Sequence, residues 1–275
     1  MSGSEGKPHR LRLCLVGWGA IGRRVAELLR ARDEDRIEIV AVAVRDTAQA
    51  RDDLPDSARL IARPEELDGL DVDVVVEAAG RGAVAPWGEA ALRAGRDFVV
   101  SSSSAFCDER LLRRLIDLAE ESGGRIAVPP GALGGVDALS AAALLPLESV
   151  EHTIVKPPEA WRGTQAETLV DLDRVEDAVT FFQGSARQAA DRFPQNANVA
   201  VISALAGIGL DRTRVLLVAD PSARRNAHEL HAAGAFGALH VRLENEPLAT
   251  NPKSSEMTAL NLARHLEARV APLVH

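Results

Sequence analysis

The sequence contains few of the residues that mark several classes of protein. It has no tyrosine among its 275 residues, and aromatic residues make up only 3% of it. Two cysteines, Cys14 and Cys107, are too few for a disulfide framework and lack the spacing of a zinc site. No apolar run approaches the ~18 residues of a membrane span. We therefore expect a cytoplasmic protein with neither a structural metal nor a membrane anchor.

Basic residues are outnumbered by acidic ones. Lysine and arginine total 32, aspartate and glutamate total 40, and the net charge is −8. This balance argues against non-specific binding to nucleic acid. An anionic substrate would therefore need a local group of cations. Only three of the basic residues are lysines, Lys7, Lys156 and Lys253, and Lys7 belongs to a polar stretch, 1–10, expected to be disordered and not a signal peptide.

A glycine loop follows the first apolar run. Residues 11–16 predict a buried strand, and residues 22–32 an amphipathic helix. Between them stand Gly17, Gly19 and Gly22, with Ala20 and Ile21 inside the loop. A strand that enters a G-x-G-x-x-G turn and then a helix is the dinucleotide-binding fingerprint, in which the helix N-terminus meets the phosphates. The sequence thus predicts an NAD or NADP site here.

The choice between NAD and NADP stays open. A second strand, 37–44, ends at Arg45 and Asp46. A carboxylate at this place usually holds the ribose 2′-hydroxyl, whereas an arginine accommodates a 2′-phosphate. Either residue could also be an ordinary charge of a solvated loop.

The pattern along the chain predicts an α/β protein. Strands at 57–63, 72–80, 97–100 and 125–128 alternate with helical segments at 82–94 and 108–122, as in a doubly wound parallel sheet. After Pro129-Pro130 the pattern changes. Residues 151–155, 215–219, 229–233 and 238–243 predict strands of a smaller mixed or antiparallel sheet, with helices at 194–205 and 254–270. We expect a Rossmann domain over 1–133, a catalytic and dimerising α+β domain over 134–245, and a C-terminal helix in 246–275 that returns to the Rossmann domain.

Two loops are candidates for ligand contact. Residues 101–106, which include four serines, follow a strand at the carboxyl edge of the sheet, where open α/β sheets bind ligands. They could equally be a polar loop that caps the next helix. Residues 130–135 contain three glycines and Ala132. They suggest close approach of the backbone, either to a ligand or within a hinge.

The richest polar stretch of the second half runs from residue 220 to 230. It holds Asp220, Arg225, Asn226 and His228. A histidine suits acid–base work near neutral pH. Five other histidines are expected to have surface or hydrogen-bonded structural roles: His152, His231, His240, His265 and His275.

These segments together resemble the L-aspartate dehydrogenase family almost from end to end. The most specific are 131–135, 182–187, 193–200, 220–228 and 250–255. The resemblance implies that Ala132 and Asn198 contact the dinucleotide and that His228 is catalytic. Pro130 departs from the small hydroxylated residue expected before the glycine.

The activity implied is reversible oxidation of L-aspartate to iminoaspartate, then hydrolysis to oxaloacetate and ammonia. His228 would be the general acid–base, with Asp220 a candidate orienting partner. Iminoaspartate could alternatively feed pyridine nucleotide biosynthesis. Two substrate carboxylates call for placed cations, with Asn226 as a further polar contact. The candidate cations are Lys156, Arg162, Arg187, Arg225 and Lys253.

Two alternatives compete with this hypothesis. One is a two-domain dehydrogenase for a neighbouring metabolite, such as a homoserine- or dihydrodipicolinate-type enzyme, which should lack the Asn198 and His228 segments together. The other is a dinucleotide-binding sensor without catalysis, for which His228→Ala should be harmless. In every case the second sheet is expected to present a face and an edge that a homodimer would cover.

Overall fold

The computed structural model describes residues 10–274 except 33–34, 52 and 195–196. His275 and most of the polar stretch 1–10 lie outside these residues. The chain forms two compact units. Unit 1 comprises the chain up to residue 101, then 113–129 and the C-terminal residues from 262; unit 2 comprises 102–112 and 130–261. The domain boundaries after residues 133 and 245 stay a prediction.

Unit 1 is built on a six-stranded sheet in which every pair of neighbours is parallel. Its order, β3-β2-β1-β4-β5-β6, is that of a Rossmann fold. The inner strands are almost continuously buried, as expected when helices cover both faces of a parallel sheet. The strands are β1 Leu11–Val16, β2 Ile37–Ala43, β3 Arg59–Ile61, β4 Val74–Glu77, β5 Asp97–Val100 and β6 Ile126–Ala127.

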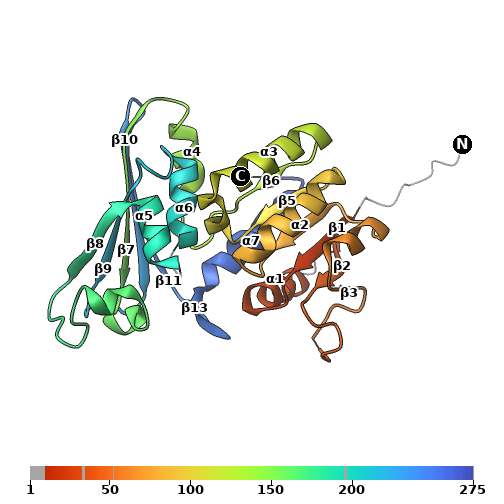
Figure 1. Ribbon diagram of the computed structural model, residues 1–275, viewed down its shortest axis with the longest axis horizontal. Helices are drawn as coiled ribbons and strands as arrows, with labels where there is room; N and C mark the ends of the chain where they lie inside the picture. The colour runs from red at the N-terminus through yellow and green to blue at the C-terminus, as the bar shows by residue number, and fades with distance from the viewer. Residues whose placement is uncertain (1–9, 33–34, 52, 195–196, 275) are drawn as a thin grey trace, which may run out of the picture. The chain divides into compact units, whose positions relative to one another are not determined.

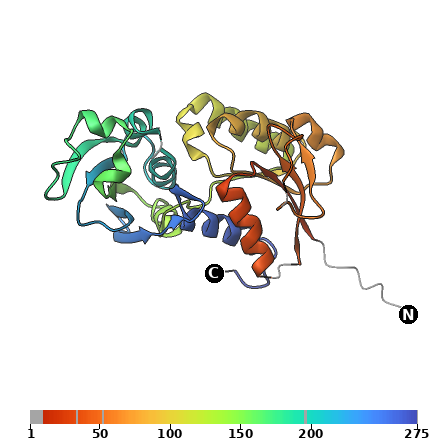
Figure 2. The same cartoon turned by 90° about the horizontal axis from the view of Figure 1, so that it is seen from below.

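Helices lie on both sides of this sheet. Figure 2 shows α1 (Ala20–Ala31) on one side and α2 (Arg81–Arg93) with α3 (Glu109–Ser122) on the other. A 3₁₀ segment, η1 (Pro64–Gly69), follows β3. The chain returns to unit 1 with the second half of α7 (Glu256–Ala268) and the residues after it, where Arg269 pairs with Asp97.

Unit 2 is built on a five-stranded mixed sheet of order β11-β10-β7-β9-β8. The pair β7–β9 is parallel, and the other neighbours are antiparallel. Its strands are β7 Leu147–Lys156, β8 Val179–Ser185, β9 Arg214–Ala219, β10 Asn226–Gly234 and β11 Gly237–Asn245, with a separate ribbon of β12 Pro247–Leu248 and β13 Asn251–Ser255. The predicted fold class, a Rossmann sheet followed by a mixed sheet and a C-terminal helix, is confirmed.

Helices α4 (Val136–Ala142), α5 (Ala186–Arg192) and α6 (Ala197–Ala206) pack on one side of the second sheet, as Figure 1 shows. Three 3₁₀ segments complete the unit: η2 Ser103–Cys107, η3 Pro158–Trp161 and η4 Gln165–Thr168. The sequence-based assignment lacks β8, α4 and α5, and it also lacks the β12–β13 ribbon and the three 3₁₀ segments of this unit.

Four of the nine aromatic residues form one cluster in unit 2. Trp161 stacks edge-on against Phe181 with ring centroids 4.8 Å apart. Phe193 contacts Phe181 and Phe182 in the same way, at 5.9 and 5.1 Å. Trp161 also donates from Nε1 to the carbonyl of Val218 at 3.0 Å. Fully buried aromatic rings contribute large apolar area, so this cluster anchors η3 and the end of α5 to the sheet.

No helix among the described residues is both long and apolar enough to cross a bilayer.

Candidate active site

The glycine loop of unit 1 has the geometry that its fingerprint predicts. Gly17 has φ +101°, and a Cβ added to it would lie 2.7 Å from Cα of Ala79. A Cβ on Gly22 would lie 2.3 Å from the carbonyl oxygen of Gly17. Both positions therefore need glycine for the protein's own packing. Gly19 differs, because a Cβ added to it would meet nothing within 4 Å, so the space beside it is open. Gly19 directly precedes α1, and the first backbone N–H groups of a helix have no partner within the helix and can bind an anion.

A cavity of about 970 Å³ borders this loop. It is lined by Gly17 and Gly19, and by Arg45, Asp46 and Arg51 from the segment after β2. Ala20, Ile21 and Gly22 form the first turn of α1. A cavity lined by both open glycine backbone and charged side chains fits a dinucleotide. These residues could hold the pyrophosphate and the adenosine ribose respectively.

Glu77 is a site residue that sequence reasoning missed. It lies at the end of β4, and its side chain is fully buried. One carboxylate oxygen accepts from the backbone N–H groups of Ala79 and Gly80, at 2.8 and 2.7 Å. Both of those residues line the same cavity. A carboxylate at the carboxyl end of a Rossmann strand was the available signal, and its effect here is to fix the β4–α2 turn.

In unit 2 the predicted dinucleotide contacts lie in hydrogen-bonded turns. The side-chain oxygen of Asn198, in the first turn of α6, accepts from the backbone N–H of Ser104 at 2.9 Å. Ser103 donates from its hydroxyl to the carbonyl of Asn198 at 2.9 Å. Ser103 and Ser104, both in unit 2, therefore pack on the start of α6. Ala132 is buried, and its carbonyl accepts from the side chain of Asn245 at 3.1 Å.

His228 lies on β10 and is 7% exposed. Its Nδ1 lies 3.2 Å from Nε2 of His152 on β7. His152 is fully buried, and its Nδ1 lies 3.0 Å from the hydroxyl of Ser203 on α6. The prediction of Asp220 as the orienting partner is wrong, because the Asp220 carboxylate instead accepts from the backbone N–H and hydroxyl of Ser222, at 2.8 and 2.7 Å. His152, expected to have a surface or structural role, is the partner of His228.

Burial controls the protonation of this pair. Desolvation lowers the pKa of His152 to about 4. Desolvation also lowers the pKa of His228 well below its ordinary value, and the neighbouring His152 and Lys156 add to the effect. Both imidazoles are therefore neutral at pH 7. A neutral imidazole with one nitrogen held by a fixed partner can accept or donate a proton at the other nitrogen.

The five candidate cations differ in their surroundings. Lys156 lies at the end of β7, its Nζ is 5.0 Å from the Trp161 ring, and its charge acts on His228. Burial lowers the pKa of Lys156 to about 8.

The others are surface groups, mostly engaged in ion pairs. Arg187 pairs with Asp211 and Glu109, Arg162 pairs with Asp173, and Arg225 pairs with Glu246. Asn226 opens β10 opposite Asn245, and Lys253 is exposed on β13. Lys156 is thus the candidate that the structure associates with His228.

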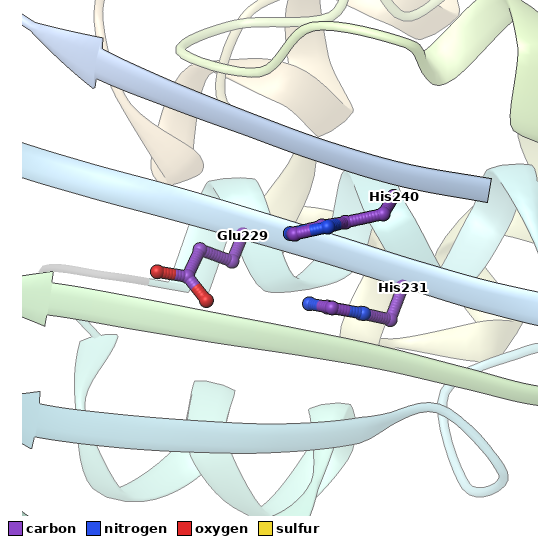
Figure 3. A group of neighbouring side chains, drawn as sticks. All are labelled: Glu229, His231 and His240. Carbon is purple, nitrogen blue, oxygen red and sulfur yellow. The ribbon is translucent and has the colours of Figure 1, made fainter.

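A second group of polar side chains lies on the opposite face of the same sheet. Figure 3 shows Glu229 and His231 on β10 beside His240 on β11. Their ligand atoms lie within 4.8 Å of one another, and the two rings stack at 3.9 Å. Arg242 forms an ion pair with Glu229, and both histidines are exposed. The carboxylate is thus already neutralised, and we read the group as a surface cross-strand cluster.

Comparison with known proteins adds the decisive observation. A family model described as "Aspartate dehydrogenase, C-terminal" matches residues 137–269, and one described as "Homoserine dehydrogenase, NAD binding domain" matches 17–129. An L-aspartate dehydrogenase of Brucella anthropi is 63% identical over 262 residues, which cover 95% of this chain and 97% of that protein. The chain belongs to the aspartate dehydrogenase family. An L-aspartate dehydrogenase of Pseudomonas aeruginosa is 43% identical and covers 93% of this chain and 96% of its own.

Solved structures support the same fold for this aspartate dehydrogenase family member. The crystal structure of aspartate dehydrogenase from Thermotoga maritima superposes with a TM-score of 0.77, at 24% identity, over 97% of this chain and 100% of that one. A hyperthermophilic archaeal homoserine dehydrogenase in complex with NADPH gives a TM-score of 0.61 at 12% identity, over 97% and 100%. Family membership and the glycine loop together make this chain an NAD- or NADP-dependent oxidoreductase.

Proposed function

We propose that this family member oxidises L-aspartate with NAD or NADP, and that His228 is its general acid–base. The observation that carries the proposal is the buried, neutral His228 beside Lys156, in a chain whose other unit carries the dinucleotide loop. The high identity to proteins named L-aspartate dehydrogenase supports the choice of substrate.

The chemistry assigns a role to each group. A nicotinamide dinucleotide held by the glycine loop would supply the acceptor for the hydride that leaves Cα of the substrate. Hydride loss from Cα requires a neutral amino group, whose lone pair forms the C–N double bond. His228 takes the proton that the substrate ammonium must lose and passes it to solvent; it then takes a proton from the water that adds to the iminium carbon and returns it to the departing nitrogen. Collapse of the adduct releases ammonia and oxaloacetate, and the reverse sequence aminates oxaloacetate.

Lys156 is proposed to bind a substrate carboxylate. It is the candidate cation whose charge acts on His228, and its burial strengthens any interaction with an anion. Arg225, Asn226 and Lys253 stay proposed substrate contacts at the surface of the same unit. Binding the second carboxylate through Arg225 would require exchange of its ion pair with Glu246.

Ala132 and Asn198 are proposed contacts of the dinucleotide. Asn198 keeps an amide N–H₂ group besides the oxygen that holds Ser104. The Asn245 side chain positions Ala132 by donating to its carbonyl. The methyl side chain of Ala132 leaves room for a ligand but supplies no functional group. Gly17, Gly19, Ala20, Ile21 and Gly22 are the proposed phosphate-binding loop, with Arg45 and Asp46 at the adenosine end.

We further propose a homodimer through unit 2. Strands β11 and β8 are the edges of its sheet, and edges of this kind are commonly covered by association. Sedimentation that shows a monomer at micromolar concentration would remove this proposal. The cytoplasmic location, and a role in pyridine nucleotide biosynthesis, stay predictions from the sequence.

A substrate panel tests the proposed function. NADH or NADPH formation at 340 nm and released ammonia would be measured with L-aspartate, D-aspartate, L-glutamate and L-homoserine. We expect strong preference for L-aspartate, with equal amounts of reduced dinucleotide and ammonia. Preference for L-homoserine without ammonia would favour the homoserine-type alternative, and dinucleotide binding without any turnover would favour the sensor.

A further inference from the structure

Behind His228 lies a line of buried polar groups. His228 on β10, His152 on β7 and Ser203 on α6 are linked at 3.2 and 3.0 Å. Ser203 and His152 are both fully buried. The line ends at the carbonyl of Ala200, which accepts from the Ser203 hydroxyl at 3.0 Å. All of these residues belong to unit 2.

The donors and acceptors in this line fix its direction. Ser203 has one hydroxyl hydrogen, and the Ala200 carbonyl can only accept. When Ser203 donates to that carbonyl, its oxygen accepts from Nδ1–H of His152. Nε2 of the neutral His152 then carries a lone pair and accepts from Nδ1–H of His228. In the neutral His228 the remaining nitrogen, Nε2, therefore carries a lone pair.

The opposite direction forms one hydrogen bond fewer. In that arrangement Ser203 donates to His152, and His152 donates to His228, so the side-chain bond to Ala200 is lost. His228 would then carry its proton on Nε2 and could not accept one there. Because the three groups are buried, each hydrogen bond counts and no solvent replaces the one that is lost. The favoured direction is therefore the first one, in which Ser203 donates to the Ala200 carbonyl and His228 carries its proton on Nδ1.

We propose that Ser203 and His152 are positioning residues that hold His228 in the tautomer whose Nε2 accepts a proton. The inference rests on the proposed role of His228 as the general base. It assigns no chemical step to Ser203 or His152 themselves. Lys156 is the other titratable group whose charge acts on this imidazole.

The sharpest perturbation is Ser203→Ala. Without the hydroxyl, the first direction leaves a buried N–H of His152 unpaired, whereas the opposite direction leaves only a lone pair unpaired. An unpaired buried N–H is the costlier of the two, so the line should reverse. We expect kcat to fall about ten- to a hundredfold, within the range that acid–base catalysis contributes, with KM for L-aspartate and the Kd of the dinucleotide unchanged within about twofold.

Two variants serve as matched controls. Ser203→Thr keeps the hydroxyl and should retain most of kcat. Ser140→Ala removes another helical serine of the same unit, whose hydroxyl donates to the carbonyl of Val136 at 2.8 Å. It should leave kcat unchanged. Thermal unfolding of all three reports whether a loss of activity reflects loss of folded protein.

The tautomer is read directly by NMR of protein labelled with ¹⁵N in the histidine rings. The His228 signals are assigned by their absence from His228→Gln. We expect a proton on Nδ1 and none on Nε2 of His228 in the wild type, and the reverse in Ser203→Ala. A wild-type His228 with its proton on Nε2, or a Ser203→Ala protein with wild-type tautomer and kcat, would overturn the proposal.

The catalytic role of His228 and the positioning role of Ser203 are tested separately. If His228→Gln retains wild-type kcat, the general-base function is wrong, whatever the spectrum shows. If His228→Gln is inactive but Ser203→Ala loses activity without a change of tautomer, the function stands and the positioning role is overturned.

Discussion

Two glycines of the dinucleotide loop should respond in opposite ways to the same substitution. Alanine at position 22 would place its Cβ 2.3 Å from the Gly17 carbonyl oxygen. Carbon–oxygen contacts are usually about 3.3 Å or longer, so the loop or α1 must move by roughly 1 Å. Alanine at position 19 would meet nothing within 4 Å, and the backbone there has φ −86°, which alanine adopts without strain.

The magnitudes follow from these contacts. Overpacking of this kind costs about 1–3 kcal/mol and should lower the Tm of Gly22→Ala by about 3–10 °C. In Gly19→Ala the weaker helix cap is offset by the lower entropy of the unfolded chain, so Tm should stay within about 2 °C of wild type. The new methyl group, however, fills the space proposed for the pyrophosphate. We expect the Kd for the dinucleotide to rise at least tenfold, or about 1.4 kcal/mol.

Differential scanning fluorimetry without ligand and isothermal titration with NAD and NADP measure the two quantities. A Gly19→Ala protein that binds both dinucleotides with wild-type affinity would refute the proposed pyrophosphate site beside Gly19. A Gly22→Ala protein as stable as wild type would show that the short contact with Gly17 carries no cost.

Three further predictions concern charge. Lys156→Met should raise stability at pH 7, because burial lowers the pKa of Lys156 to about 8 from its ordinary value of 10.5. Between pH 8 and 10.5 the lysine is protonated in the unfolded chain but neutral in the folded protein, so the stability of the wild type rises with pH. The advantage in Tm of Lys156→Met over wild type should therefore shrink across this range. An advantage that grows with pH would contradict the lowered pKa of Lys156. Both Arg269 and Arg125 pair with Asp97, but the Arg269 side chain is 19% exposed and the Arg125 side chain 77% exposed. Arg269→Met should therefore cost about 1–3 kcal/mol in urea unfolding, whereas Arg125→Met should change stability by less than about 0.5 kcal/mol. Equal effects would be inconsistent with this difference in burial. Arg45→Ala should raise KM for NADP about tenfold and leave KM for NAD within about twofold, since an arginine there would meet only the 2′-phosphate; steady-state kinetics with both dinucleotides decide it, and an equal change for both would rule out that contact.

The Rossmann sheet could be predicted because its signals are local. Its strands are short, continuous apolar runs, and its glycine loop has a fixed spacing. The missing β8 and α5 had a weaker signal. In β8 only Phe182 is buried, so the strand shows no clear alternation. Ser185 and Gln188 do form a capping box at the start of α5, and this pattern could have located that helix.

The partner of His228 could not be predicted in the same way. It depends on the antiparallel register of β7 and β10, which sets His228 opposite Ile154 and brings His152 onto the same face. The two histidines are 76 residues apart in the chain. Asp220 was the nearer polar candidate in sequence, and a short turn closed by Ser222 satisfies it locally. The available signal was the buried alternation of Val150, His152 and Ile154 in β7.

The sequence also could not predict that each unit is made of separate segments of the chain. The division falls within both α3 and α7. Helices that continue from one unit into the other carry no break in their hydrophobic pattern, so the sequence offers no signal at those places.

The central claim is that the His228 imidazole transfers the proton that aspartate oxidation requires. The most direct measurement is NADH or NADPH formation at 340 nm from L-aspartate by His228→Gln, beside wild type and His240→Gln, with dinucleotide binding measured on the same samples. We predict that His228→Gln binds the dinucleotide within about twofold of wild type but loses about 10²–10⁴-fold in kcat, while His240→Gln turns over normally. A His228→Gln enzyme with wild-type kcat would contradict the account.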